Sequence, residues 1–276
     1  MQSLVGYLLW LSNVTRSDPA TITSILSQHT SNPTPAHIRA ATYATHYVKG
    51  TKAREICFST HTNNDLSAYL HFPTTPTKLL PLCDANWVGQ DQSLPDQNKP
   101  IELPLFTSWS ISGFIVMFNG PLHWGSCQQR VIVHSSAEVE IYVTDEYVKN
   151  LLRLKHFISD TKTNSMFLPT ASPIQVFNDN NAWVCWSKST NTKCLWHMMI
   201  CENSVRESVQ SETVTVAHIA GDFNIADILT KDLKDTTNFT NIRNVITSED
   251  PTTNYSSPVQ SKGGIPTYIG TLSPSL

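Results

Sequence analysis

An aspartate inside an apolar run is the feature that most constrains how this chain can fold. The segment LLPLCDANWVG at 79–89 has the length and apolar content of a buried strand, and Asp84 lies within it. Burying a carboxylate is costly unless a donor or a cation lies beside it. The segment therefore predicts a buried strand whose one charged side chain has a partner elsewhere in the fold.

Three further acidic residues stand at informative places in predicted elements. Glu140 lies early in a helix expected at 136–156, Asp179 ends a short strand, and Asp227 opens a final helix. If these acids converged with Asp84 they would need cations, and such hard oxygen ligands select Mg²⁺ or Mn²⁺. Two ions of this kind can activate a water and stabilise a leaving oxygen in phosphodiester hydrolysis. The acids therefore raise the hypothesis of a metal-dependent nuclease.

Each acid also has an ordinary structural explanation. Asp179 precedes two asparagines and could cap the helix expected after it. Glu140 and Asp227 could be solvated helix residues. A solvated position is harder to assign to Asp84, because its neighbours in the strand are apolar. Spacing alone therefore leaves the metal site as one hypothesis among several.

The predicted elements follow a mixed α/β order. Apolar periodicity and turn signals predict helices at 3–12, from 18 onward and at 35–48, short elements within 54–70, strands at 79–89, 110–120 and from 121, a helix at 136–156, a strand at 172–179, helices at 180–188 and 193–209, a strand at 213–219 and a final helix at 224–233. Asn119-Gly120 is a hairpin signal between two of the strands. We expect a helical segment at 1–71, a Thr/Pro linker at 72–78, a domain at 79–235 and a disordered tail at 248–276.

Composition limits the function classes. A net charge of -3 and 15% charged residues are unusual for a self-sufficient nucleic-acid binder, which normally has a basic surface. Basic residues must either cluster on one face or be supplied by other domains. No stretch is long enough to span a membrane, and no nucleophile elbow of a serine hydrolase is present.

The six cysteines indicate reduced thiols in an intracellular protein, because they are irregularly spaced and include no CxxC pair. Cys194, His197 and Cys201 share one face of a predicted helix. No fourth ligand follows at a suitable spacing, so a core-facing stripe is favoured over a zinc site. The sequence does not indicate whether the compartment is cytoplasmic or nuclear.

Several short segments match, in order and at ordinary spacing, those of a known family. They are SLVGYLLWLSNVTRSD beside VGSLLYL…TRPD, PAHIRAATYATHYVKGT beside P…H…A…RYLKGT, CDANWVG beside DADWAG, SWSISGF beside RRSTSGY, PLHWGSCQQ beside ISWSSKKQ, SSAEVEIY beside SSAEAEY, NDNNAW beside DNQAA, VRESV beside IRE, and NIADILTKDL beside ADILTKPL. Over roughly residues 3–245 the chain thus resembles the C-terminal part of copia-type retrotransposon Pol polyproteins. It carries no YxDD polymerase motif and no integrase-like zinc-binding region.

The resemblance implies an RNase H fold, a five-stranded mixed sheet flanked by helices, and cleavage of the RNA strand of RNA–DNA hybrids. By position in the motifs, the family's four acids, which bind two Mg²⁺ (or Mn²⁺) ions, correspond to Asp84, Glu140, Asp179 and Asp227. Glu140 is chosen over Glu138 because it matches the second Glu of SSAEAEY. The partners implied are an RNA–DNA hybrid and the polymerase portion of the polyprotein, which residues 1–71 would follow.

Nucleic-acid contacts are expected from the side chains around the strand after the hairpin and the later helices. The candidates are Gln128, Gln129, Arg130, Lys188 and Lys193. Related ribonucleases often carry a histidine that assists product release in the loop before the last helix. His218 and Asp222 lie in that loop here, although neither aligns convincingly.

The chain also departs from the family pattern. The second Asp of DADW is Asn86, the basic pair before STSGY is absent, and the two lysines of SSKKQ are Cys127 and Gln128. These changes remove positive charge where a nucleic-acid backbone could run. They leave open a second hypothesis, a catalytically inactive retroelement relic that binds nucleic acid or protein weakly.

Overall fold

A computed structural model describes residues 1–58, 66–72, 78–87, 110–129, 131, 135–160, 173–188, 199–231, 233 and 236–249. Its elements are α1 (Gln2–Val14), α2 (Ala20–Gln28), α3 (Pro35–Gly50), β1 (Arg54–Glu55), β2 (Leu80–Asn86), β3 (Ile111–Met117), β4 (Pro121–Gln128), α5 (Ser136–Asp160), β5 (Ile174–Asn178), α6 (Asn181–Ser187), α7 (Met199–Gln210), β6 (Val214–His218), the 3₁₀ helices η2 (Gly221–Phe223) and η3 (Ile225–Leu229), α8 (Thr236–Ile246) and β7 (Ser248–Glu249).

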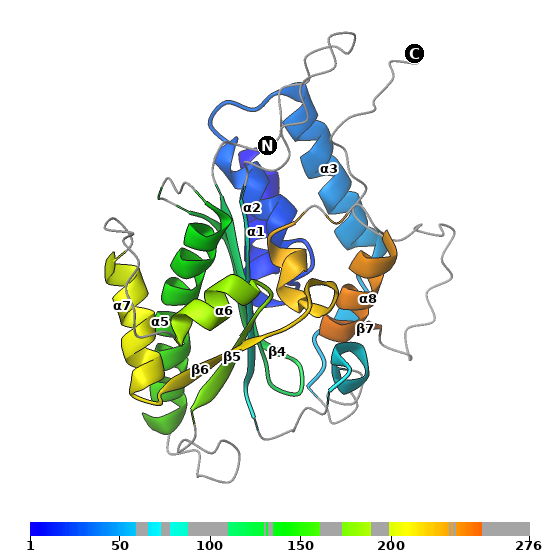
Figure 1. The fold of residues 1–276 in the computed structure, drawn as a ribbon. Coiled ribbons are helices and arrows are strands. Elements are labelled where there is room, and N and C mark those ends of the chain that lie inside the picture. Colours follow the sequence, from blue (N-terminus) through cyan, green and yellow to red (C-terminus); the bar gives the residue numbers. More distant parts are fainter. Residues whose placement is uncertain are drawn as a thin grey trace.

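A five-stranded mixed sheet lies at the centre, with strand order β4-β3-β2-β5-β6 (Figure 1). β2, β3 and β4 pair antiparallel, whereas β5 runs parallel to both β2 and β6. The predicted α/β class and five-stranded mixed sheet flanked by helices are confirmed, and they are consistent with an RNase H-like fold. The predicted hairpin is also present between β3 and β4, with positive φ at Asn119 and Gly120.

The two faces of the sheet bury two separate cores, because side chains alternate along each strand. On one face Cys83, Val116 and Val176 pack against the apolar side of α5. On the other face Leu82 and Phe177 pack in the cluster that includes η3 and α8. Figure 1 shows α5, α6 and α7 on one side of the sheet, with α1, α2, α3 and α8 on the other.

The N-terminal helices pack directly on the sheet. Trp124 of β4 donates its indole N–H to the Ser12 carbonyl of α1 at 2.6 Å. The Thr21 hydroxyl of α2 donates to the Ile228 carbonyl of η3, also at 2.6 Å. Tyr47 of α3 packs in the hydrophobic cluster that includes the η3 residues and one face of the sheet. The Thr21 hydrogen bond fixes α2 against η3, the segment that carries Asp227.

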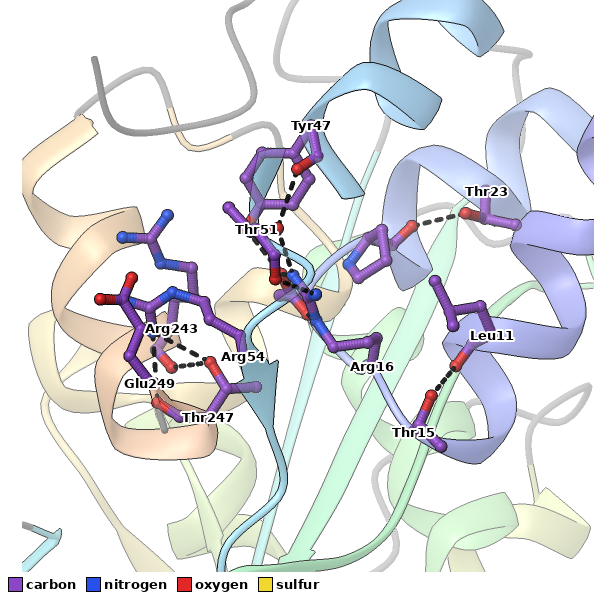
Figure 2. Close-up of polar contacts among 12 residues, drawn as sticks. Leu11, Thr15, Arg16, Thr23, Tyr47, Thr51, Arg54, Arg243, Thr247 and Glu249 are labelled. Carbon is purple, nitrogen blue, oxygen red and sulfur yellow. Dashed lines mark hydrogen bonds and ion pairs between the residues drawn. The ribbon is translucent and has the colours of Figure 1, made fainter. Parts of the chain in front are cut away.

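A buried polar network holds the ends of the N-terminal helices together (Figure 2). Arg16 makes a two-pronged ion pair with Asp18, at 2.8 and 2.7 Å, and also donates to the carbonyl and hydroxyl of Thr51. The Tyr47 hydroxyl donates to Asp18 at 2.6 Å. Because these groups are buried, each charge depends on its partner, and removing one would leave another unsatisfied.

The short sheet β1–β7 pairs the segment just after α3 with the C-terminal end of the described residues. Arg54 of β1 donates to Thr247 at 3.3 Å and pairs with Glu249 of β7 at 3.1 Å (Figure 2). The first two residues of the predicted tail, Ser248 and Glu249, therefore form a strand. The rest of the predicted tail, 250–276, lies outside the described residues.

Two sequence predictions near the C-terminal end need correction. The final helix predicted at 224–233 is the short 3₁₀ helix η3, and a true α-helix, α8, follows where no element was expected. η3 is short because Asn224 caps its start and Thr230 leaves helical geometry at its end. Within the described residues no helix is long and apolar enough to cross a membrane.

Candidate metal centre

Three aspartates converge at one edge of the sheet. Carboxylate oxygens of Asp84, Asp179 and Asp227 all lie within 4.8 Å of one another. β2 and β5 run parallel with Leu82 beside Phe177, so the residues two positions further on, Asp84 and Asp179, are neighbours on the same face. The parallel pairing therefore brings together two acids that are distant in sequence, and η3 supplies the third.

The segment around η3 is fastened to β2 by hydrogen bonds. The Asn224 amide donates to the Cys83 carbonyl at 3.1 Å, and its oxygen accepts from the backbone N–H of Ala226 at 3.2 Å. At the other end of η3 the Thr230 hydroxyl donates to the Asp84 carboxylate. These contacts hold Asp227 over the strand that carries Asp84.

Asp179 is not the cap of the following helix. Asn180 caps α6, because its side-chain oxygen accepts from the backbone N–H of Trp183 at 3.1 Å. The Asp179 carboxylate is thereby left to face the other acids. His218, at the end of β6, contacts the Asp179 backbone carbonyl at 3.1 Å rather than its carboxylate.

Glu140 approaches the three aspartates from α5. Its carboxylate accepts a hydrogen bond at 2.8 Å from the amide of Asn178, the residue before Asp179. Burial, followed by repulsion from Asp84, raises the pKa of Glu140 well above its ordinary value. Glu138 is also buried, but two positions along a helix point to nearly opposite sides. Glu140 thus borders the cluster without belonging to the group of three.

Two of the aspartates also hold protons more tightly than usual. Burial, followed by repulsion from Asp84, raises the pKa of Asp227 to about 8 and raises that of Asp179 in the same direction. Both shifts report negative charge that the protein compensates only in part. A divalent cation would supply that compensation.

Lys231 provides the positive charge that is present. Its Nζ atom lies 2.9 Å from Asp227, 3.2 Å from Asp84 and 3.8 Å from Asp179. Burial alone would lower the pKa of Lys231, but the attraction of the three carboxylates raises it above its ordinary value. Lys231 was not among the predicted site residues, although its spacing of four residues from Asp227 is that of a helical ion pair.

The donor set fits a hard divalent cation. Three carboxylates within 4.8 Å, buried or half-buried, offer the oxygen ligands that Mg²⁺ and Mn²⁺ prefer. No thiol or imidazole belongs to this group of three, so its chemistry does not favour zinc. The predicted acids Asp84, Asp179 and Asp227 are therefore brought together, with Glu140 beside them.

The predicted nucleic-acid contacts are placed differently. Gln129 is buried, and its amide donates to the Ser112 hydroxyl at 2.9 Å and the Val139 carbonyl at 3.2 Å, so it joins β3 to α5. Gln128 is half-buried at the end of β4, and Lys188 is exposed after α6. Arg130 and Lys193 lie outside the described residues, as do Cys194 and His197 of the cysteine stripe.

Comparison with known proteins finds low-identity relatives over most of the chain. It is 26% identical, over 85% of its length, to the retrovirus-related Pol polyprotein from transposon RE1 of Arabidopsis thaliana. It is 25% identical, over 83% of its length, to the corresponding polyprotein from transposon TNT 1-94 of Nicotiana tabacum. It spans only 14% and 15% of those two proteins, respectively.

A relative of another description covers about half of the chain. The secreted RxLR effector protein 161 of Plasmopara viticola is 28% identical over 52% of this chain and 83% of that protein. No family model and no solved structure matches the chain significantly. The similarity that covers most of the chain relates it to retrotransposon Pol polyproteins.

Proposed function

We propose that the chain is a ribonuclease H that hydrolyses the RNA strand of RNA–DNA hybrids. The observation that carries the proposal is the convergence of Asp84, Asp179 and Asp227 within 4.8 Å on an RNase H-like sheet. Similarity to retrotransposon Pol polyproteins supports it, because the motifs that resemble that family imply cleavage of such hybrids. The polymerase portion of a Pol polyprotein is accordingly the protein partner that we propose.

In the proposed reaction the three aspartates and Glu140 would hold the cations. Two Mg²⁺ or Mn²⁺ ions would activate the attacking water and stabilise charge on the phosphate and the leaving oxygen. Asn178 keeps the Glu140 carboxylate oriented, and the Asn224 and Thr230 contacts keep η3 over Asp84. The residues therefore provide a site whose geometry is fixed before substrate binds.

Substrate selection would depend on duplex shape and on the 2′-hydroxyl groups of one strand. Of the predicted backbone contacts that are described, Gln128 and Lys188 have side chains that reach solvent. Gln129 is instead engaged inside the protein. Hybrid affinity should therefore be weak and only shallowly dependent on salt, since few positive charges are available to neutralise phosphates.

The alternative, an inactive relic with weak nucleic-acid or protein binding, is favoured by one specific observation. The chain has a net charge of -3. It also has uncharged residues at motif positions where the family that it resembles carries lysine or arginine. The acids argue for retained catalysis, and the charge argues for lost affinity. The two hypotheses differ in whether the folded protein cuts a hybrid at high concentration.

The decisive experiment compares the chain with an Asp179→Asn variant on an end-labelled RNA–DNA hybrid, in Mg²⁺ and in Mn²⁺. The matched control is Asp160→Asn, the same substitution at an exposed position at the end of α5. We expect metal-dependent cleavage of the RNA strand by the wild type and the control, and none by Asp179→Asn. A folded wild-type protein that cuts nothing with either metal would favour the relic.

A further inference from the structure

The ammonium group of Lys231 lies among the oxygen atoms that a cation would bind. Nζ contacts Asp227 and Asp84 at 2.9 and 3.2 Å and approaches Asp179 at 3.8 Å. These are the same three residues whose oxygens lie within 4.8 Å of one another. The lysine is thus paired with the whole cluster rather than with a single acid.

Lys231 and a divalent cation cannot use these oxygens together. Mg²⁺ lies about 2.1 Å from its ligand oxygens and demands a nearly regular arrangement of six of them. A cation bound to the three aspartates would therefore stand within a few ångströms of Nζ, where two positive charges repel strongly. The hydrogen bonds of Lys231 to the carboxylates would also occupy lone pairs that the cation needs.

The Lys231 side chain can move from the cluster to solvent. The Lys231 backbone N–H donates to the Asp227 carbonyl at 2.9 Å and keeps the main chain in place, so only the side chain has to move. About a third of the side chain, 34%, is exposed, whereas the Asp84 side chain is 1% exposed. The ammonium group can therefore swing toward solvent while Asp84 and Asp227 keep their places.

We propose that Lys231 is a built-in counter-ion that competes with the divalent cation for Asp84, Asp179 and Asp227. The proposal rests on the proposed function, because it assumes that these acids bind metal. Without metal, the lysine offsets the repulsion among the acids and keeps the site assembled. With metal, it leaves, so Lys231 sets the cation concentration at which the site becomes loaded.

The first test measures Mn²⁺ binding by electron paramagnetic resonance for the wild type, Lys231→Met and Lys231→Arg. Lys231→Met removes the competing ammonium group and with it one charge-assisted hydrogen bond to the carboxylates. Lys231→Met should therefore bind Mn²⁺ roughly ten- to a hundredfold more tightly than the wild type. Lys231→Arg keeps the charge and should stay near the wild type. Lys149→Met is the matched control, because it removes an ammonium group paired at 2.6 Å with Asp145 elsewhere on α5.

A second test uses thermal unfolding and does not depend on activity. In chelator, Lys231→Met should melt below the wild type, and saturating Mn²⁺ should raise its melting temperature more than it raises that of the wild type. Lys231→Gln, which keeps an N–H donor but loses the charge, serves if the methionine variant does not fold. Equal or weaker Mn²⁺ binding by these uncharged variants would overturn the competition.

The outcomes separate this proposal from the proposed function. If the wild type binds Mn²⁺ and cleaves hybrid, but Lys231→Met binds no more tightly, the counter-ion proposal fails and the nuclease stands. If neither protein binds Mn²⁺ while Lys231→Met is destabilised in chelator, the metal site itself fails. In that case Lys231 is a permanent structural partner of the acids, and the competition is refuted.

Discussion

Replacing Gly113 with alanine should damage both the stability of the fold and the assembly of the acid cluster. Gly113 lies in β3 directly opposite Asp84, where η3 crosses the sheet. A Cβ atom built there would lie 2.5 Å from the Thr230 methyl group and 2.8 Å from Leu229 Cβ. Both distances fall well short of ordinary van der Waals contact, so η3 would have to move away from the strand.

The cost follows from which atoms must move. Leu229 is fully buried in the core shared by η3 and α8, so its Cβ cannot be displaced as a flexible side-chain end could be. Overpacking of this kind costs about 1–3 kcal/mol, and a rigid neighbour places Gly113→Ala in the upper half of that range. In a chain of this size, the melting temperature should fall by roughly 4–12 °C.

Urea unfolding followed by circular dichroism measures the effect, with Gly6→Ala as the control. Gly6 lies on the exposed side of α1 and has open space around it, so alanine there should be neutral or stabilising by up to about 1 kcal/mol. Because Thr230 also donates to Asp84, Gly113→Ala should weaken stabilisation by Mn²⁺ as well. Wild-type stability and an unchanged Mn²⁺ response in Gly113→Ala would refute the close approach of η3.

Three further predictions concern the buried polar groups. Asn178→Asp replaces the amide that donates to Glu140 with a like-charged acceptor, so the free energy of unfolding in urea should fall by about 1–3 kcal/mol. An unchanged free energy of unfolding would contradict the contact. In chelator, the folded state keeps a proton on Asp227, whose pKa is about 8, whereas the unfolded chain releases that proton near pH 4. The free energy of unfolding should therefore fall as pH rises from about 4 to 8 and level off above pH 8. A free energy of unfolding that rises across that range would be inconsistent with the buried cluster. Tyr47→Phe removes the 2.6 Å hydrogen bond to Asp18 and should cost about 1–2 kcal/mol in the same assay, whereas Tyr7→Phe, at an exposed site on α1, should cost nothing measurable.

Sequence patterns predicted most of the sheet but not the end of the chain. Strands such as β2 and β3 follow from continuous apolar runs and a turn signal, which are local features. α8 is rich in Thr and Asn, which are poor helix formers, and it is stabilised instead by burying Phe239, Ile242 and Ile246 in a core made with distant segments. Tertiary packing of this kind is not visible in a local pattern.

The candidate site shows the same division. The four acids could be nominated from their motifs, because each stands in a recognisable short segment. The burial of Gln129 and the cap formed by Asn180 depend on how β4, α5 and β5 meet, and the motifs do not encode those contacts. The position of Lys231 among three acids likewise depends on η3 folding back over β2.

The most direct measurement is anomalous X-ray diffraction from crystals of the full chain grown with Mn²⁺. The account predicts anomalous density within coordination distance of the carboxylates of Asp84, Asp179 and Asp227, with the Lys231 ammonium group turned away from them. Well-ordered crystals that show no manganese at these residues in saturating Mn²⁺, with Lys231 still bound to all three, would contradict the metal site on which the proposed nuclease depends.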